Sequence, residues 1–289
     1  MKHLPSLAAA ALTLVASWQA RAQSPAAPNF PPAAQTVAAG VWLIPGGFPP
    51  KREPDGTTVV FAAPRGLVVL DTGRHAWHRQ AILDLTQDRR SPIVAIVNSH
   101  WHLDHTSGNA ALKRAFPGAR VFASRAVEGA LKDFLPKSAK DTRAYLASEK
   151  VDPATAEDLR GDLATIADPA ALIPDVPIER TQTLSIGGRR LEVHLARDAA
   201  TAGDIWLYDP ATRTAAVGDL VTLPAAFLDT ACPAGWRTAL GEIWETPFRR
   251  ALQGQRAGVQ EVMDALGPGG GAVRLGSRAG GAVDQGVEG

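Results

Sequence analysis

The apolar run at residues 93–97 constrains the fold of this chain more than any other feature. All five of its residues are aliphatic. A continuous run of this length is typical of a strand that is buried on both faces, as in a parallel sheet covered by helices. The preceding segment, residues 75–88, has the helical spacing of apolar residues. A helix followed by a buried strand predicts a mixed α/β fold.

Further elements are expected in the first half of the chain, where short runs rich in β-branched residues alternate with Pro and Gly. The expected strands are residues 41–44, 57–62, 66–70 and 120–123. Helices are expected at residues 109–116 and over residues 126–159, with breaks at Pro136 and Pro153 because proline has no amide hydrogen to donate.

The second half repeats this pattern. Residues 181–186 and 190–195 flank a Gly187-Gly188 pair, which suits a hairpin turn because glycine readily adopts positive φ. The remaining expected elements are strands at residues 204–208 and 214–217 and helices at residues 236–246 and 259–266. Strand clusters that alternate with helices in both halves predict two sheets packed face to face, with helices outside.

A histidine-rich segment, SHWHLDH at residues 99–105, directly follows the buried run. Residues two apart on extended backbone project to the same side, so His100 and His102 point together, while Asp104 and His105 reach a second position after a turn. The four side chains are suited to hold one or two divalent cations. Imidazole and carboxylate ligands fit Zn²⁺, and Mn²⁺ or Fe²⁺ stay open.

The alternative interpretation is a surface loop in which Asp104 caps a helix that begins near Ser107. A capping aspartate needs no histidines around it. The metal site is therefore the favoured interpretation. His75 and His78, three residues apart on the predicted helix, are expected to be solvated or to lie at the rim of the site.

Composition restricts the chemistry further. A single cysteine, Cys232, excludes both a disulfide framework and a four-cysteine zinc site within one chain, and we expect it as a buried free thiol. The 30 basic and 29 acidic residues leave a formal net charge of +1. This balance excludes a broad electrostatic footprint for nucleic acid or an anionic membrane, so the expected partner is a small-molecule substrate.

The two ends differ in composition from the middle. Residues 1–22 predict a signal peptide with a basic start, a short apolar run and a small-residue cleavage site, so we expect export to the periplasm or the medium. The apolar run is too short to span a bilayer. The Ala- and Pro-rich residues 23–40 predict a flexible lead-in, and the Gly-rich residues 267–289 predict a disordered tail. One domain, residues 41–266, lies between them.

These motifs resemble the metallo-β-lactamase superfamily of metal-dependent hydrolases. The family's D-T-G and late G-D motifs are matched by residues 71–73 and 218–219, and the resemblance covers about residues 41–252. The family's H-x-H-x-D-H motif is matched by His100, His102, Asp104 and His105. The resemblance implies a four-layer αββα sandwich and a substrate-shaping insertion at residues 126–159.

The resemblance also implies roles for the matched residues. His100 and His102 would hold a first metal, Asp104 and His105 a second, and Asp219 would bridge the two. The implied reaction is attack of an activated water molecule on an ester, thioester, lactone or β-lactam carbonyl, with Asp104 as the catalytic residue that orients the water or accepts its proton. Asp71, in the D-T-G motif, is expected as a buried structural carboxylate.

Two positions depart from the family pattern. Ala200 stands where the H-T-x-G-D segment has a ligand histidine; we expect Asp198 as its preferred substitute and expect His194 to face away from the site. Gln255 best matches the last family histidine, and a neutral amide is a poor zinc ligand. A frameshifted C-terminus is one hypothesis that accounts for both Gln255 and the Gly-rich tail.

These departures leave two functions open. The first is an exported zinc-dependent hydrolase. The second is a catalytically weak or inactive member of the family, whose impaired metal site binds a ligand without turning it over.

Overall fold

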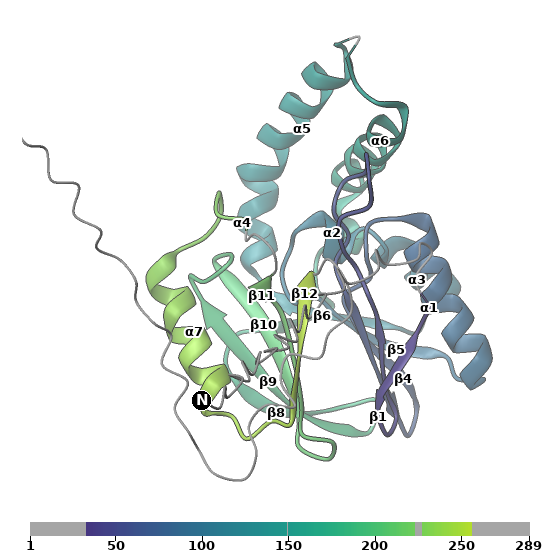
Figure 1. Cartoon of the computed structure of the whole chain (residues 1–289), viewed down its shortest axis with the longest axis vertical. Coiled ribbons are helices and arrows are strands. Elements are labelled where there is room, and N and C mark those ends of the chain that lie inside the picture. The colour runs from purple at the N-terminus through teal and green to yellow at the C-terminus, as the bar shows by residue number, and fades with distance from the viewer. Residues whose placement is uncertain (1–32, 149, 223–226, 256–289) are drawn as a thin grey trace, which may run out of the picture.

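The computed structural model describes residues 33–148, 150–222 and 227–255. The described strands form two sheets, one of seven strands and one of five. They pack face to face with helices on both outer sides, which is the predicted four-layer sandwich (Figure 1).

The larger sheet has the strand order β1-β2-β3-β4-β5-β6-β7. Its first four strands pair antiparallel, and β4 to β7 pair parallel. The bounds are β1 (Gln35–Ala38), β2 (Val41–Ile44), β3 (Thr58–Ala63), β4 (Gly66–Leu70), β5 (Ile93–Val97), β6 (Arg120–Ser124) and β7 (Val176–Ile178).

The smaller sheet has the order β12-β11-β10-β9-β8 and is antiparallel except for the β11–β12 pair. Its hairpin turns at Gly187 and Gly188, which both have positive φ, as the sequence predicts. The bounds are β8 (Gln182–Ile186), β9 (Arg189–Arg197), β10 (Gly203–Asp209), β11 (Thr214–Thr222) and β12 (Arg250–Gln255).

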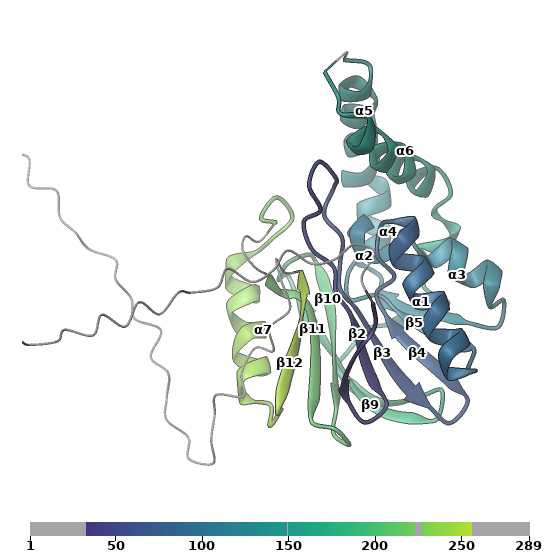
Figure 2. The same cartoon turned by 45° about the vertical axis from the view of Figure 1, so that its right-hand side comes forward.

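The helices occupy three places. Figures 1 and 2 show α1 and α3 on the outer face of the larger sheet, α7 on the outer face of the smaller sheet, and α5 and α6 rising beyond the sandwich. The bounds are α1 (Ala76–Arg89), α2 (Leu103–Thr106), α3 (Asn109–Ala115), α4 (Ala126–Lys132), α5 (Phe134–Leu146), α6 (Pro153–Ala167), the 3₁₀ turn η1 (Pro169–Ala171) and α7 (Pro233–Glu245).

The core is layered as the strand periodicity requires. One apolar cluster fills the space between the sheets, and its members from β5 are Ala95 and Val97. A second cluster joins the outer face of the larger sheet to α1, and there β5 contributes Ile93 and Ile96. The predicted central strand is therefore buried on both faces, which explains why its sequence has no polar alternation.

Several boundaries correct the sequence-based expectations. Residues 35–38, expected within the flexible lead-in, form β1, because that segment pairs antiparallel with β2. The helix break expected at Pro136 lies at Asp133 instead, and Pro136 sits in the first turn of α5, where the missing amide hydrogen costs no bond. Pro153 begins α6, with the Asp152 carboxylate accepting a hydrogen bond from the amide of Ala154.

Other expectations fall on parts of the chain outside the described residues. These are the signal peptide, most of the lead-in, the helix at residues 259–266 and the Gly-rich tail at residues 267–289. Within the described residues, no helix combines the length and the apolar character needed to cross a bilayer.

A buried ion pair ties the two sheets together at one end of the sandwich. The Arg189 guanidinium contacts the fully buried Asp209 carboxylate at 2.5 Å within the smaller sheet. The same guanidinium donates a 2.7 Å hydrogen bond to the carbonyl oxygen of Ala62 in the larger sheet. Burial raises the pKa of Asp209, but hydrogen bonds from Arg189 and Thr212 outweigh it and hold that pKa below its usual value.

We predict that Arg189→Met lowers the free energy of unfolding by about 3 kcal/mol, because it leaves a buried carboxylate without its partner. Urea unfolding measures this, with the exposed neighbour substitution Arg190→Met as the matched control. Because the pKa of Asp209 is lower in the folded state, its ionised carboxylate stabilises the fold at pH values above the unfolded-state pKa of about 3.9. This stabilisation is lost as the pH falls through the folded-state pKa. Equal stability of the two variants at pH 7 contradicts the assignment.

Candidate metal centre

The site lies where parallel strands of the larger sheet end. Asp71 directly follows β4, and residues 98–100 directly follow β5. Because β4 and β5 run parallel, their carboxyl ends reach the same edge of the sheet. The position of the histidine-rich segment therefore follows from the predicted strand order.

Asp71 organises this edge. Its φ of 61° is left-handed, a conformation that aspartate tolerates better than most residues. The carboxylate is 1% exposed and accepts hydrogen bonds from the Ser99 amide at 2.7 Å and the Ser99 hydroxyl at 2.6 Å. It also contacts Nδ1 of His105 at 2.8 Å. Asp71 is thus a buried structural carboxylate beside the site, as the sequence predicts.

These hydrogen bonds fix which ring nitrogens carry protons. The Asp71 carboxylate accepts only, so neutral His105 carries its hydrogen on Nδ1 and leaves Nε2 bare. The Ser99 hydroxyl donates to Asp71 and therefore accepts from Nδ1 of His100 at 2.9 Å, which leaves Nε2 of His100 bare as well. One carboxylate orients both imidazoles.

The bare nitrogens converge on Asp219. Nε2 of His105 lies 3.2 Å from Oδ1 of Asp219, and Nε2 of His100 lies 4.0 Å from Oδ2. One ligand atom from each of the three residues falls within 4.8 Å of the others. Both nitrogens and Oδ1 of Asp219 are buried without a hydrogen bond. Two imidazole nitrogens and a carboxylate oxygen gathered in this way could hold a divalent cation.

Asp219 reaches this position through two glycines. It lies within β11, after Gly218, whose φ of 52° is left-handed and suits glycine. Strand β12 then passes close to the carboxylate, and a Cβ on Gly254 would collide with Oδ1 of Asp219. The local geometry therefore requires glycine both at position 218, in the late G-D motif, and at position 254 on β12.

The other two predicted ligands flank this trio. Oδ2 of Asp104 lies 3.4 Å from Nε2 of His105. The ring of His102 meets the ring of His100 edge-on, with centroids 4.4 Å apart. Nε2 of His102 lies 3.0 Å from the Thr230 hydroxyl, which donates its own hydrogen to the carbonyl oxygen of Ala200. Nε2 of His102 therefore donates, and its Nδ1 is the nitrogen left to bind a ligand.

The negative charges of the carboxylates around the site favour a positive charge between them. Burial lowers the pKa of His105, but the carboxylates of Asp219, Asp104 and Asp71 outweigh it and raise that pKa well above its usual value. Burial, aided by the charge of His105, lowers the pKa of His100 well below its usual value. Three carboxylates converge on one imidazole, and without a metal ion a proton on His105 balances part of their charge.

The two departures from the family pattern have different outcomes. Ala200 is buried, and its carbonyl oxygen accepts the Thr230 hydrogen bond. Asp198 is exposed and outside the cluster, so our preferred substitute ligand is wrong. His194 stacks on Trp206, which packs in the cluster under α7, so it faces away from the site, as expected. Gln255 ends β12, and its side chain lies outside the described residues.

Two histidines were misjudged from the sequence. His75 and His78 are 4% and 0% exposed, so the expectation of solvated residues is wrong. Both contact Oδ2 of Asp55, at 2.9 and 3.2 Å, and His75 also lies 3.2 Å from Asp158 on α6. The sequence has no motif that signals Asp55, because its partners come from distant segments.

The single cysteine also differs from expectation. Cys232 is exposed rather than buried.

A cleft of about 490 Å³ lies over the site. Asp104, His102 and Asp219 line it together with apolar side chains. Several of these come from the insertion expected to shape the substrate site. The apolar lining residues are Phe48, Pro54, Trp101, Leu103, Phe134, Leu135, Leu159 and Phe227.

A sequence model of the metallo-beta-lactamase superfamily matches residues 52–267. The chain therefore belongs to the metallo-beta-lactamase superfamily. Comparison with curated proteins gives no match.

Solved structures share the fold at low sequence identity. A metallo-beta-lactamase from Pontibacter korlensis is 19% identical with a TM-score of 0.55, and the match covers 77% of this chain and 90% of that one. A metallo-beta-lactamase from Hirschia baltica is 13% identical with a TM-score of 0.54, over 79% and 93%. The sec-alkylsulfatase Pisa1 from Pseudomonas sp. is 18% identical with a TM-score of 0.56, over 77% of this chain and 38% of that one.

We predict that Asp71→Asn weakens binding of a divalent metal ion by about 10–100-fold, because the amide cannot accept from Ser99 and His105 together as the carboxylate does. Competition with a chromophoric chelator measures the affinity. Asp84→Asn, on the solvent side of α1, is the matched control. Unchanged affinity in a folded Asp71→Asn protein contradicts the positioning role.

Proposed function

We propose that this protein is a zinc-dependent hydrolase of an ester, thioester, lactone or β-lactam bond. The observation that carries the proposal is the convergence of three buried donor atoms, on His100, His105 and Asp219, beside an open cleft; their one close mutual contact is 3.2 Å, between His105 and Asp219. Buried polar atoms are rarely left unpaired unless a ligand or metal completes them. Membership of the superfamily supports the same chemistry.

The residues of the site would have different roles in such a reaction. His100, His105 and Asp219 would hold the metal, with His102 and Asp104 beside them. A bound divalent cation supplies Lewis acidity, which lowers the pKa of water toward about 7. Asp104 then orients the attacking water and accepts its proton at a carboxylate oxygen.

The surroundings of Asp104 suit the orientation of water more than the acceptance of its proton, because they keep the carboxylate ionised. Burial raises the pKa of Asp104, but the charges of His105, Arg74 and His102 outweigh it and hold that pKa well below its usual value. The carboxylate is therefore ionised and ready to accept a hydrogen bond from water at neutral pH. Nη2 of Arg74 lies 3.9 Å from Oδ1 of Asp104.

The cleft favours a substrate with an apolar group next to the scissile carbonyl. Half of its lining residues are aromatic or aliphatic, with Phe134 and Leu135 from α5 and Phe227 beside the ring of His102. Arg74 is the single lysine or arginine among the described lining residues, and it is paired with Asp162, while four carboxylates line the same cleft. A neutral aryl or alkyl ester or lactone matches this lining better than a carboxylate-bearing β-lactam.

The second candidate function is ligand binding with little or no turnover. The replacement of the family histidine by Ala200 favours it, because a first metal then lacks one nitrogen ligand. Thr230 restrains His102 in this region without adding a nitrogen ligand. Metal content and turnover separate the two functions.

We predict that the purified protein retains at least one equivalent of zinc through dialysis and hydrolyses neutral aryl esters or lactones faster than nitrocefin. His102→Ala should lower turnover by about 100-fold or more, because it removes a ligand nitrogen. His194→Ala, whose ring stacks on Trp206 away from the site, is the matched control. Zinc without turnover, or absence of zinc, contradicts the hydrolase and supports the binding function.

We also propose that residues 1–22 direct export of the protein. The basic start, short apolar run and small-residue cleavage site support this. N-terminal sequencing of the mature protein should begin at Gln23. A mature protein that still begins at Met1 contradicts the proposal.

A further inference from the structure

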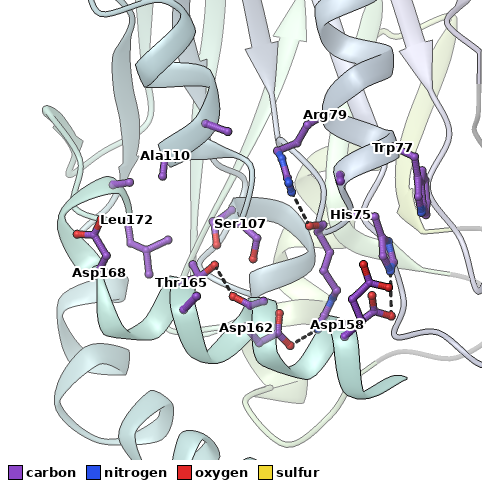
Figure 3. Close-up of a pocket in the computed structure, with 18 of the residues that line it drawn as sticks. His75, Trp77, Arg79, Ser107, Ala110, Asp158, Asp162, Thr165, Asp168 and Leu172 are labelled. Carbon is purple, nitrogen blue, oxygen red and sulfur yellow. Dashed lines mark hydrogen bonds and ion pairs between the residues drawn. The ribbon is translucent and has the colours of Figure 1, made fainter. Parts of the chain in front are cut away.

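A second cavity, of about 500 Å³, lies between α1, α3 and α6 (Figure 3). Arg74 and Asp162 line both this cavity and the metal cleft, so their ion pair forms part of the wall between the two. The cavity exists because the helices present short side chains to one another. These are Ala76, Ala110, Ala111, Gly161, Ala164 and Ala171.

Most of the carboxylates around this cavity are already paired. Arg52 contacts Asp158 at 2.6 Å and Glu157 at 3.0 Å. Arg74 pairs with Asp162. Asp168 lies beside Leu172, at the opposite end of the cavity from Arg79 (Figure 3).

Two arginines that line the cavity have no carboxylate partner among the described residues. Arg79 donates a 3.0 Å hydrogen bond to the backbone oxygen of Arg74, and neither Arg79 nor Arg114 forms an ion pair with a described residue. Burial lowers the pKa of Arg79, and the positive charge of Arg114 lowers it further against the opposing charge of Asp55. Arg79 and the exposed Arg114 thus both line one cavity and repel each other, and an anion between them would relieve that repulsion.

A third polar group points to the same kind of ligand. The Ser107 hydroxyl oxygen is buried without a hydrogen-bond partner, and Ser107 lines the same cavity (Figure 3). A serine hydroxyl has one hydrogen that it can donate to an anionic oxygen. Cavities of this size with a few polar groups on otherwise small, apolar walls are typical of small-molecule sites.

We propose that this cavity binds a small anion through a carboxylate or phosphate group, held by Arg79, Arg114 and Ser107. Arginine suits this chemistry because its planar fork of donors matches both oxyanions. The site is separate from the metal cleft and does not depend on the proposed hydrolase activity.

Isothermal titration of the zinc-loaded protein with inorganic phosphate, and separately with succinate, tests the proposal at constant ionic strength. At least one probe should bind saturably with a Kd of about 1 mM or tighter. Arg79→Gln should weaken that binding by about tenfold or more, because it removes a charged hydrogen-bond donor. Arg160→Gln, an exposed arginine on α6 that does not line the cavity, should leave it unchanged.

A metal-site variant separates the two cavities, because phosphate also binds zinc. Binding that persists in His102→Ala but is lost in Arg79→Gln supports the second site. Binding lost in His102→Ala and kept in Arg79→Gln assigns the anion to the metal centre and overturns the proposal. Failure of both probes to bind the wild-type protein also overturns it. Thermal unfolding verifies that each variant is folded. If Arg79→Gln does not fold, Ser107→Ala replaces it as the test variant, because it should also weaken anion binding.

Discussion

The hydrogen bonds of Asp71 are the constraint on which the rest of the site depends. One buried carboxylate accepts from the amide and hydroxyl of Ser99 and contacts Nδ1 of His105. These bonds join the ends of β4 and β5 and turn the bare nitrogens of two imidazoles toward Asp219. The parallel sheet sets the position of the site, and Asp71 sets its orientation. Loss of such support for metal ligands typically costs about 10–100-fold in affinity.

Sequence periodicity was sufficient for most of the fold, and the reason is visible in the core. The five residues of β5 serve apolar clusters on both faces, so their unbroken apolar pattern identifies a central strand. The H-x-H-x-D-H spacing likewise places its donors together, because it follows that strand directly. Strands β1, β7 and β12 were missed. β1 and β7 are only four and three residues long, and β12 has no β-branched residue, so each depends on its neighbour for pairing.

Long-range electrostatics explains what the sequence did not predict. The spacing of His75 and His78 resembles that of a solvated helix face, yet both rings are buried against Asp55, a residue from a loop twenty positions earlier in the chain than His75. Asp158, from the insertion, completes this contact with His75. Arg74 continues the network, because it pairs with Asp162 on α6 and lies near Asp104. The insertion is thus connected to the metal centre through buried charges that no local pattern encodes.

The central claim is that His100, His105 and Asp219 together bind a divalent cation. Anomalous diffraction at the zinc edge, from crystals grown with zinc, tests it most directly. We expect a peak about 2.0–2.2 Å from Nε2 of both histidines and from a carboxylate oxygen of Asp219. Imidazoles turned away from Asp219, with no anomalous peak between them, would contradict it.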